Sequence, residues 1–595
     1  MSENRISFSK LFWPSFLAVL IAGLIGMLLF FLVIGGIIGS FGDFGPQPLN
    51  LKDNTVLHVK LSGTISDIET ESLDPYTLKV DKSLNIAEII IGLQKAANDK
   101  KIKGIFLEMK NPEMGMATAN ELRSAIEDFQ HSGKFVVAYL AGEQVSQRDY
   151  YVSSVCNEVY GMHGATFLWH GLQAESYFFK KLLDELQMSV IVVRGKENDF
   201  KSAVEPFYLN QMSDSSRHQT KELLDNLWSN VRNDVAKSTA TDTAYLDSLA
   251  YNLNIRNLTH AKRFRLIDKN LYRHEVLYLI KKKAGIEDNA TLRLQKFKKY
   301  AKEAFEDNQK IAAQKNHIAV INAQGEVQSE GPQVSTVRMM RLLKEVREND
   351  QIKGVVLRIN SPGGSAMASE EIWKEISLTA AKKKLYVSMG DYAASGGYYI
   401  ATPANKIFAS PMTITGSIGV FGLLPYGGDF MQKKLGINTD EVLTHQFGEL
   451  SLTRRPNETE IQMIQTEIDT IYQLFVKRVS GGRKISKDEV QKIARGRVWS
   501  GSSALKLGLV DAMGGLQKTI SELQKELGIE KVVFYPKKKP NTIDMFLSIL
   551  DEQLEDDFSD SKMSIGYFLS YFEKFTQIIQ MKGIQMRLPF VLRIH

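Results

Sequence analysis

The feature that most constrains this chain is an internal duplication, in which one order of motifs occurs twice. KIKGIFLEMKNP at 101–112 matches QIKGVVLRINSP at 351–362, and YYVSSVCNEVYG at 150–161 matches YYIATPANKIFA at 398–409. The order is the same in both copies and the offset between them drifts only slightly, as expected for a duplication with small insertions. A chain of 595 residues is also too long for one hydrophobic core. We therefore predict two domains of one fold.

Each copy alternates two kinds of pattern. Apolar runs rich in β-branched residues, such as GVVLRI and LYVSM, are followed by helical patterns such as ASEEIWKEISLTAAKKK. This alternation is typical of βα units around a mostly parallel sheet, so the predicted fold class is α/β. Between the copies, residues 292–316 are charged and favour a helix, which predicts a helical connector.

The N-terminal region predicts a membrane anchor. Residues 11–39 carry no charged side chain, and a bilayer span needs only about 20 apolar residues. The run is too long for a signal-peptide core and lacks an A-x-A-like cleavage site. Arg5 and Lys10 precede it, whereas SFGDFGPQPLNLKDN, which follows it, has two acids against one lysine. The positive-inside rule then predicts a single pass with the N-terminus in the cytoplasm and the bulk of the chain outside.

The two copies differ at the loop GDYAASGGYYIA, 390–401, and also at SPGGS, 361–365, which faces NPEMG at 111–115 in the first copy. Aligning the Tyr-Tyr pairs of the copies sets Ser395 opposite Gln147 and the two glycines after Ser395 opposite Arg148-Asp149. A glycine turn that served only the fold would have no reason to vanish from one copy. One interpretation is that Ser395 caps a helix after a strand-to-helix turn. The other is a nucleophile presented beside a helix N-terminus, with glycines that permit close backbone approach.

A nucleophilic serine needs a base, because an unassisted hydroxyl reacts poorly. No histidine lies between Ser395 and His445, and Ala393 stands where G-x-S-x-G requires its first glycine. These two departures exclude an α/β-hydrolase.

The first copy offers Lys201 as the base, within NDFKSAVEPF at 198–207. Its neighbours are largely apolar, and burial lowers the pKa of a lysine towards the range in which the neutral amine accepts a proton. Two alternatives stay open: Lys201 is a solvated surface lysine, or the nearby Asp199 keeps it charged.

Together, GDYAASGGYYIA, INSPGGS, TGSIGV at 415–420 and FKSAVEPF, in a chain with an N-terminal anchor, resemble the long, duplicated form of signal peptide peptidase A. This family comprises bacterial membrane-bound serine proteases with a crotonase/Clp-protease-like fold, and the resemblance covers about residues 56–529. It implies that Ser395 is the nucleophile and Lys201 the general base. It further implies that Ser417 orients the lysine amine and that Gly364 and the N–H of Gly396 form the oxyanion hole.

The resemblance also implies partners and a location. The expected substrates are signal-peptide remnants and similar apolar peptides, cut at the outer face of the bacterial cytoplasmic (inner) membrane by a homotetramer. The segment IGVFGLL at 418–424 is a candidate lining for an apolar groove, although it fits a core strand equally well.

Composition points away from other ligands. The formal charge of +6 is small and spread along the chain, so nucleic-acid binding is not expected. The ten histidines and the single cysteine form no H-E-x-x-H or Cys/His cluster, so neither a metal nor a cofactor is expected.

Two other functions compete with the protease. A crotonase-type acyl-CoA enzyme would use the oxyanion hole on a thioester, and a membrane-anchored scaffold would bind partners through its degenerate copy and its C-terminal tail. The predicted organisation is as follows: a cytoplasmic N-terminus at 1–10, the anchor at 11–39, a first repeat with the lysine at 50–291, the connector at 292–316, a second repeat with the serine at 317–540, and a tail at 541–595.

Overall fold

The computed structural model describes residues 16–18, 20–28, 49, 51–69, 71–73, 80–195, 197–312, 315–448, 450–536 and 584–587. The chain divides into two compact units, Met1–Lys52 and Asp53–His595. In the first unit, residues 16–18 and 20–28 are helical, and the rest of the predicted anchor and the predicted cytoplasmic N-terminus lie outside the described residues. Within the described part of the chain, no helix is both long and apolar enough to span a bilayer.

The second unit contains a parallel sheet built from the first repeat. Its strands run in the order β10 (Lys269–Asn270), β7 (Glu158–Gly161), β5 (Phe135–Leu140), β4 (Ile102–Met109), β1 (Thr55–Leu61) and β11 (Leu294–Lys296). The repeated motif at 101–112 therefore supplies a central strand. The pairing of β11 with β1 corrects the predicted connector, because its first residues extend the sheet and only α11 (Phe297–Ala312) is helical.

The second repeat builds a sheet with the same strand order. Its strands are β22 (Ala512–Met513), β18 (Lys406–Ala409), β17 (Lys384–Ala394), β15 (Ile352–Ser361), β12 (His317–Gln324) and β23 (Val532–Tyr535). The long strand β17 pairs with β18 through residues 386–389 and then with β19 (Ile414–Gly416) through residues 392–394. Strand β21 (Val498–Ser500) pairs antiparallel with β19. The duplication in the sequence is thus a duplication of sheet topology, and the α/β prediction is confirmed.

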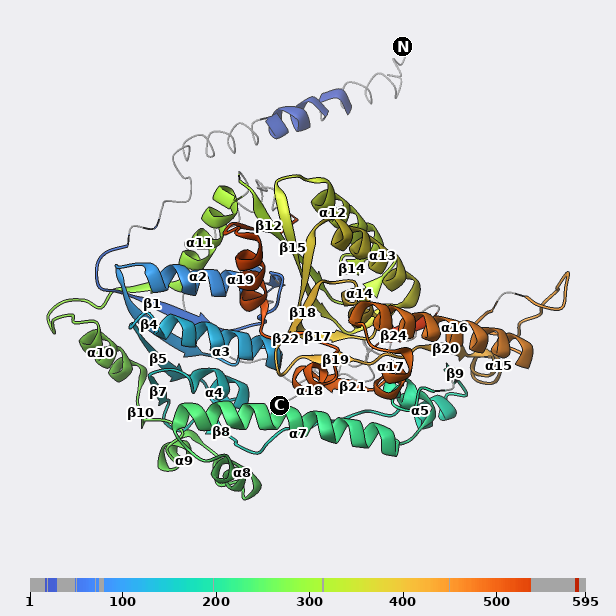
Figure 1. The fold of residues 1–595 in the computed structure, drawn as a ribbon, viewed down its shortest axis with the longest axis horizontal. Helices are drawn as coiled ribbons and strands as arrows, with labels where there is room; N and C mark the ends of the chain where they lie inside the picture. The colour runs from blue at the N-terminus through green and yellow to red at the C-terminus, as the bar shows by residue number, and fades with distance from the viewer. Residues whose placement is uncertain are drawn as a thin grey trace, which may run out of the picture. The chain divides into compact units, whose positions relative to one another are not determined.

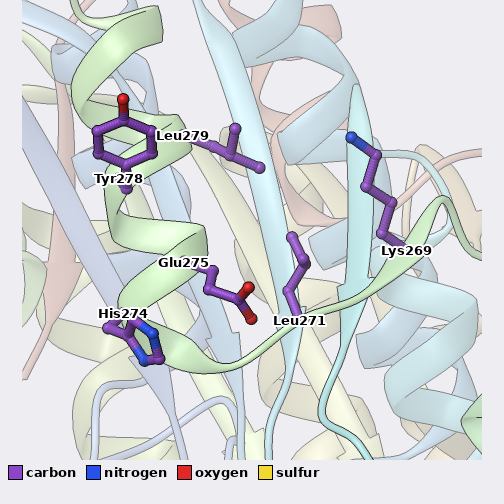
Figure 2. Close-up of a pocket in the computed structure, with 6 residues that line it drawn as sticks. All are labelled: Lys269, Leu271, His274, Glu275, Tyr278 and Leu279. Atoms are coloured by element: carbon purple, nitrogen blue, oxygen red, sulfur yellow. The ribbon is translucent and has the colours of Figure 1, made fainter.

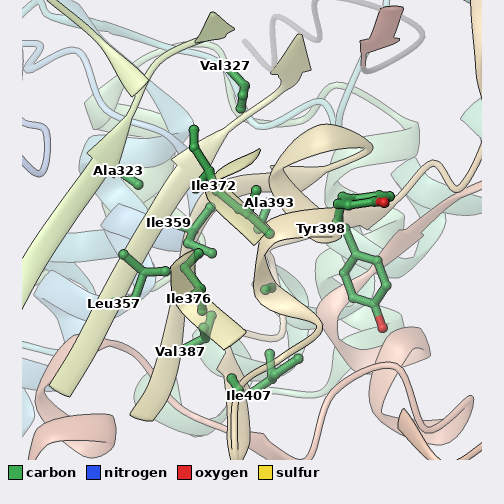
Figure 3. Packing of buried hydrophobic residues seen from close by; sticks show 14 of the residues in the cluster. Ala323, Val327, Leu357, Ile359, Ile372, Ile376, Val387, Ala393, Tyr398 and Ile407 are labelled. Atoms are coloured by element: carbon green, nitrogen blue, oxygen red, sulfur yellow. The ribbon is translucent and has the colours of Figure 1, made fainter. Parts of the chain in front are cut away.

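Alternate residues of the second sheet pack into two different apolar clusters, as successive side chains of a strand must. On one face, Leu357 and Ile359 pack with α12 (Thr336–Glu348) and α13 (Ala366–Lys382), which contributes Ile372 and Ile376 (Figure 3). On the other face, Val356 and Tyr386 pack with α19 (Leu516–Leu527) and with Phe305 of α11. Both faces are covered, which is why these strands read as continuous apolar runs.

The first sheet is covered in a similar way by helices of its own repeat (Figure 1). Val276 and Ile280 of α10 (Arg273–Lys283) pack against Phe106 and Tyr139 of the sheet. The other helices of this repeat are α2 (Ile86–Asn98), α3 (Met116–Gln130), α4 (Gln147–Ser153), α5 (Lys180–Glu185), a 3₁₀ turn at Ser202–Val204, α6 (Glu205–Tyr208), α7 (Asp214–Thr239), α8 (Thr243–Tyr251) and α9 (Leu258–Arg263). Its short strands are β2 (Glu71–Leu73), β3 (Val80–Lys82), β6 (Gln144–Val145) and β8 (Thr166–Phe167).

A third sheet joins the two repeats. Its order is β14 (Val334–Ser335), β13 (Val327–Gln328), β16 (Gly363–Ser365), β24 (Ile584–Arg587), β20 (Phe421–Tyr426) and β9 (Ser189–Arg194). Strand β9 belongs to the first repeat but pairs antiparallel with β20 of the second. Strand β24 belongs to the predicted tail, and residues 541–583 and 588–595 of that tail lie outside the described residues.

Buried charges also connect the repeats. Arg358 of β15 is fully buried and forms ion pairs of 2.7 Å with both Asp67 and Glu121 of the first repeat. The side chain of Asp391 accepts hydrogen bonds from the amide and the hydroxyl of Thr118, at 3.0 and 2.6 Å. The two repeats therefore share one compact unit. The remaining helices of the second repeat are α14 (Gly396–Ala401), α15 (Gly428–Leu435), α16 (Glu458–Arg483), α17 (Lys487–Ile493) and α18 (Gly501–Lys506).

Candidate active site

Ser395 lies at the point where β17 ends and α14 begins. Its backbone has φ 55° and ψ −115°, a combination that costs a non-glycine residue of order 1–3 kcal/mol, and its N–H donates to the carbonyl of Gly416 at 2.8 Å. Its side chain makes no capping hydrogen bond to α14. The capping interpretation of this serine is therefore wrong, and the strained turn points the hydroxyl elsewhere.

The side chain of Lys201 reaches this hydroxyl from the other repeat. The distance from Lys201 Nζ to Ser395 Oγ is 2.8 Å, and Nζ also donates to the Ser417 hydroxyl at 2.9 Å and to the Ser417 carbonyl at 3.1 Å. All three residues are fully buried. Three of the residues singled out in the sequence, Lys201, Ser395 and Ser417, thus form one hydrogen-bonded group, although Lys201 and Ser395 are 194 positions apart.

The shared third sheet brings the lysine here. Lys201 follows β9, and β9 pairs with β20, the strand that begins shortly after Ser417. The N–H of Phe200 donates to the Arg495 carbonyl at 3.0 Å, and the side chain of Asn198 donates to the Val420 carbonyl at 2.9 Å. The backbone of Lys201 packs directly against Gly496, whose φ of +79° and missing side chain permit this approach. The lysine loop is therefore fixed to the second repeat on both sides.

Burial determines the electrostatics of the lysine. Complete burial of Lys201 lowers the pKa of its amine well below the ordinary value of 10.5. The sequence left open that the nearby Asp199 keeps this amine charged. Asp199 instead forms an ion pair with Arg495. The ring of Phe421 lies 6.0 Å from the amine. The interpretation of Lys201 as a solvated surface lysine is wrong.

Ser417 is held in an unusual conformation as well. It has a φ of 50°, it follows Gly416 with a φ of +78°, and its N–H donates to the Arg497 carbonyl at 2.7 Å. This left-handed pair of residues turns both the hydroxyl and the carbonyl of Ser417 towards the amine. A neutral lysine amine that donates to these two oxygens keeps its lone pair available for the proton of a third group, the Ser395 hydroxyl.

The glycines predicted for the oxyanion hole lie next to each other. A Cβ built on Gly396 would be 3.2 Å from the amide nitrogen of Gly364, so the backbones of the two loops nearly touch. Gly364 has a φ of +158°, and a side chain there would collide with the carbonyl of Val327. Close backbone approach thus requires glycine at 364, and at 396 a side chain would lie 2.6 Å from the Ser369 hydroxyl, so both loops keep their amides beside the serine.

Several supporting residues were not predicted. Asn198, Phe421 and Gly496 position the lysine loop, and Gln219 of α7 donates to the Phe200 carbonyl at 2.9 Å. Asn198 and Phe421 lie in segments that the sequence singled out for other reasons, whereas Gly496 and Gln219 belong to no such motif. Only the placement of β9 on the second repeat reveals their shared role.

A hollow of about 450 Å³ elsewhere in the first repeat is unrelated to this group. It lies between α10 and the strand before it, where Figure 2 shows Lys269, Leu271, His274, Glu275, Tyr278 and Leu279. None of the residues of the serine group lines it.

Comparison with known proteins identifies the family. Peptidase family S49 matches this chain in two segments, 128–287 and 377–530, one in each repeat. Protease 4 of Haemophilus influenzae is 31% identical over 520 residues, which cover 82% of this chain and 81% of that protein. Protease 4 of Salmonella typhi is 31% identical over 480 residues, which cover 78% of this chain and 75% of that protein.

A plant protein shows the same extended likeness. The chloroplastic serine protease SPPA of Arabidopsis thaliana is 29% identical over 509 residues, which cover 83% of this chain and 72% of that protein. These matches favour the protease over the acyl-CoA enzyme and the scaffold that the sequence left open. The chain belongs to peptidase family S49 and is a serine protease of the long, duplicated signal peptide peptidase A type.

Proposed function

We propose that this serine protease uses a Ser395–Lys201 dyad split between its two repeats. The observation that carries the proposal is the 2.8 Å separation between Lys201 Nζ and Ser395 Oγ inside a fully buried site. Burial lowers the pKa of the amine, so the lysine is present as the neutral base at a pH where a solvated lysine is still protonated.

The chemistry that follows is acyl transfer. Lys201 Nζ removes the proton from Ser395 Oγ as that oxygen attacks the carbonyl carbon of a peptide bond. The amides of Gly364 and Gly396 donate to the oxyanion, and loss of one such donor costs about 2.7–4 kcal/mol. The protonated lysine then gives its proton to the leaving amine, and water releases the acyl group. Ser417 is a positioning residue, because it holds the amine through two hydrogen bonds.

The substrate class and location are part of the proposal. The uncharged segment 11–39 supports anchoring in the bacterial cytoplasmic membrane, and the charge distribution around it supports an outward-facing protease domain. Signal-peptide remnants are apolar peptides that become available at this surface. The resemblance to signal peptide peptidase A supports these substrates, the crotonase/Clp-like fold and a homotetramer.

The dyad is tested by hydrolysis of a fluorogenic apolar peptide. We expect Ser395→Ala and Lys201→Ala each to lower kcat by about 10⁴-fold or more, and the double variant to be no worse than either single variant, because the two side chains act as one unit. Lys237→Ala, at an exposed lysine of the first repeat, is the matched control and should keep wild-type activity. Full activity in Lys201→Ala would place the base elsewhere.

Covalent labelling separates the nucleophile from the base. A serine-reactive fluorophosphonate should label wild type at Ser395, fail with Ser395→Ala, and react slowly with Lys201→Ala, whose serine is intact but not activated. Peptide mapping by mass spectrometry locates the label. Labelling of another serine in wild type would overturn the assignment.

Location is tested independently of catalysis. With the full chain expressed in bacteria, we expect the protein in the membrane fraction, resistant to high-salt and alkaline extraction, and digested by external protease only after the outer permeability barrier is opened. Recovery in the soluble fraction would contradict the anchor and leave the dyad untouched.

A further inference from the structure

Strand β17 carries a bulge directly before Ser395. The pairing of β15 with β17 shifts between Ile359 and Ser361, so that one residue of β15 faces three residues of β17, 390–392. Up to the bulge β17 also pairs with β18, and from the last bulge residue onwards it pairs with β19. A bulge bends its strand and redirects the side chains that follow it. The bulge therefore sets the direction in which β17 presents the serine.

Asn360 is the residue of β15 that faces this bulge. Its side-chain oxygen accepts a hydrogen bond of 3.1 Å from the amide of Tyr392, three residues before Ser395. A Cβ on Gly390 would lie only 2.8 Å from the side-chain carbon of Asn360, so the bulge closes tightly over this side chain. Four residues further along the chain is Gly364, a proposed oxyanion donor. Asn360 thus connects the strand of the nucleophile to the loop of the oxyanion hole.

Asp67 of the first repeat fixes the orientation of the Asn360 amide. Asn360 Nδ2 donates to Asp67 Oδ2 at 2.7 Å. An ionised carboxylate only accepts hydrogen bonds, so the NH₂ group must face Asp67, and the oxygen is left to face the Tyr392 amide. The side chain of Asp67 is 2% exposed, its other oxygen accepts from Arg358 Nε at 2.7 Å, and its backbone amide donates to the Gln324 side chain at 3.0 Å. Asp67 is therefore a firm support for Asn360.

The first repeat also holds the middle residue of the bulge, Asp391. The carboxylate of Asp391 accepts from the amide and the hydroxyl of Thr118 in α3, at 3.0 and 2.6 Å. Gly115 leaves space for this carboxylate, since a Cβ on that glycine would collide with it. In the aligned motifs, the first repeat has Lys110 where the second has Asn360. The asparagine therefore belongs to the copy that carries the serine.

We propose that Asp67 and Asn360 are positioning residues for the serine, an inference that rests on the dyad proposed above. Asp67 orients the amide of Asn360, and Asn360 fixes the bulge. The bulge in turn keeps Ser395 Oγ at its 2.8 Å separation from Lys201 Nζ. Displacement of a reacting group by about 1 Å costs about 10²-fold in rate. The first repeat therefore acts on catalysis twice, as the source of the base and as the support of the nucleophile.

An exchange of the two side chains tests this pair. Asn360→Asp places a second carboxylate against Asp67 and should lower kcat by about 10²-fold, with KM within about twofold of wild type, because it displaces the serine and not the substrate. The double variant Asp67→Asn with Asn360→Asp reverses the direction of the hydrogen bond, since the new amide donates to the new carboxylate. It keeps an acceptor for the Tyr392 amide and one negative charge beside Arg358, so kcat should return to within about threefold of wild type. A double variant as slow as Asn360→Asp would overturn the proposal.

The rate and the extent of fluorophosphonate labelling distinguish positioning from folding. In Asn360→Asp every molecule should be labelled at Ser395, but about 10²-fold more slowly than in wild type. Asn360→Ala introduces no charge and keeps the test decisive if Asn360→Asp does not fold. It should react about tenfold more slowly than wild type, again to completion. Labelling of only a fraction of the molecules at the wild-type rate would show that the substitutions disturb the fold alone, and would overturn the positioning role.

Gln309→Ala is the matched control. The side-chain oxygen of Gln309 in α11 accepts from the amide of Phe534 at 2.8 Å, so this contact also joins a side chain to the second sheet. Phe534 lies on β23, which is separated from β17 by two strands. Gln309→Ala should therefore be labelled to completion at the wild-type rate.

The wild-type protein separates this inference from the dyad. Wild type that is labelled at Ser395 and hydrolyses the peptide, together with Asn360 variants that react at the wild-type rate, overturns the positioning role and leaves the dyad in place. Wild type that is neither labelled nor active overturns the dyad, and the positioning role with it.

Discussion

The same strand-to-helix turn occurs in both repeats, and the two versions solve different problems. In the first repeat, α4 begins at Gln147 with a reciprocal capping box between Ser146 and Asp149. The side chain of Gln147 bonds to the backbone of a neighbouring loop, including a 2.7 Å bond to the Gly171 carbonyl. In the second repeat, α14 begins after Ser395, which makes no capping bond and has a strained backbone. The first turn is built for stability, whereas the second leaves the serine hydroxyl uninvolved in capping and hydrogen-bonded to Lys201 of the other repeat.

The buried tyrosines show that these turns are equivalent positions. Tyr150 donates its hydroxyl to the Leu266 carbonyl at 2.8 Å, and Tyr398 donates to the Leu509 carbonyl at 2.9 Å. The scaffold behind the loop was therefore kept in both copies while the loop itself diverged. With the proposed dyad, a duplicated fold divides a catalytic pair between its two copies, because each copy needs to retain only the residue that it supplies.

The largest expected effect concerns Lys201, the residue of the proposed dyad that the first repeat supplies. Lys201→Arg should reduce kcat by about 10⁴-fold or more, as much as Lys201→Ala, because a guanidinium stays protonated and cannot act as a base. Steady-state hydrolysis of the apolar fluorogenic peptide measures this. An active arginine variant would show that position 201 supplies charge and not a base.

The second prediction concerns Gly396, because the first repeat has a residue with a side chain, Arg148, at the aligned position. Gly396→Ala should lower kcat/KM by about 10²- to 10³-fold, because its methyl group would lie 2.6 Å from the Ser369 hydroxyl and close to the Gly364 amide, which displaces an oxyanion donor. The aligned change in the first repeat, Arg148→Ala, is the control and should leave the kinetic constants within about twofold. Equal losses of kcat/KM in Gly396→Ala and Arg148→Ala would mean that the loss comes from a disturbed fold and not from a displaced oxyanion donor.

Much of this comparison could be predicted from the sequence. The repeated motifs indicated the duplicated α/β topology, and the loss of Ser395 and its glycines from one copy singled out the copy that carries the proposed nucleophile. Lys201 was predicted from its apolar neighbours together with the family resemblance. These signals are local, since each lies within about ten consecutive residues.

The parts that the sequence did not predict depend on contacts between distant segments. Nothing near Gly496 indicates that it must admit the backbone of Lys201, and nothing in IQMR indicates a strand between β16 and β20. The extension of the sheet by β11 was missed because LQK is short and precedes a strongly helical stretch. Pairing of β9 with a strand of the other repeat is set by tertiary packing, which no periodicity encodes.

The third prediction concerns pH. Because burial lowers the pKa of Lys201, the neutral base is lost only as pH falls through this lowered value, so kcat/KM of wild type should rise with pH and reach half its maximum well below pH 10.5. Ser417→Ala should lower the maximum by about tenfold through the loss of one hydrogen bond to the amine. Its rising limb should move to lower pH, since that hydroxyl also stabilises the ammonium form. A limb that does not move would assign the titration to another group.

The smallest effect on activity is expected at the capped turn of the first repeat. Burial raises the pKa of Asp149 to about 6, above its unfolded value of about 3.9. The folded state therefore holds this proton more tightly, and the resulting stability is complete below about pH 4 and is lost as pH rises through 6. Asp149→Asn keeps an oxygen that can accept from the Ser146 amide but does not titrate.

This variant should gain stability relative to wild type between pH 4 and 7, by no more than about 3 kcal/mol, while its kinetic constants at pH 8 stay within about twofold of wild type. Urea unfolding at the two pH values measures the difference, with the exposed Asp288→Asn as control. A large loss of activity in Asp149→Asn would show that the capped turn of the first repeat still acts on the proposed dyad. The contrast between a turn that serves stability in the first repeat and a turn that presents the nucleophile in the second would then be wrong.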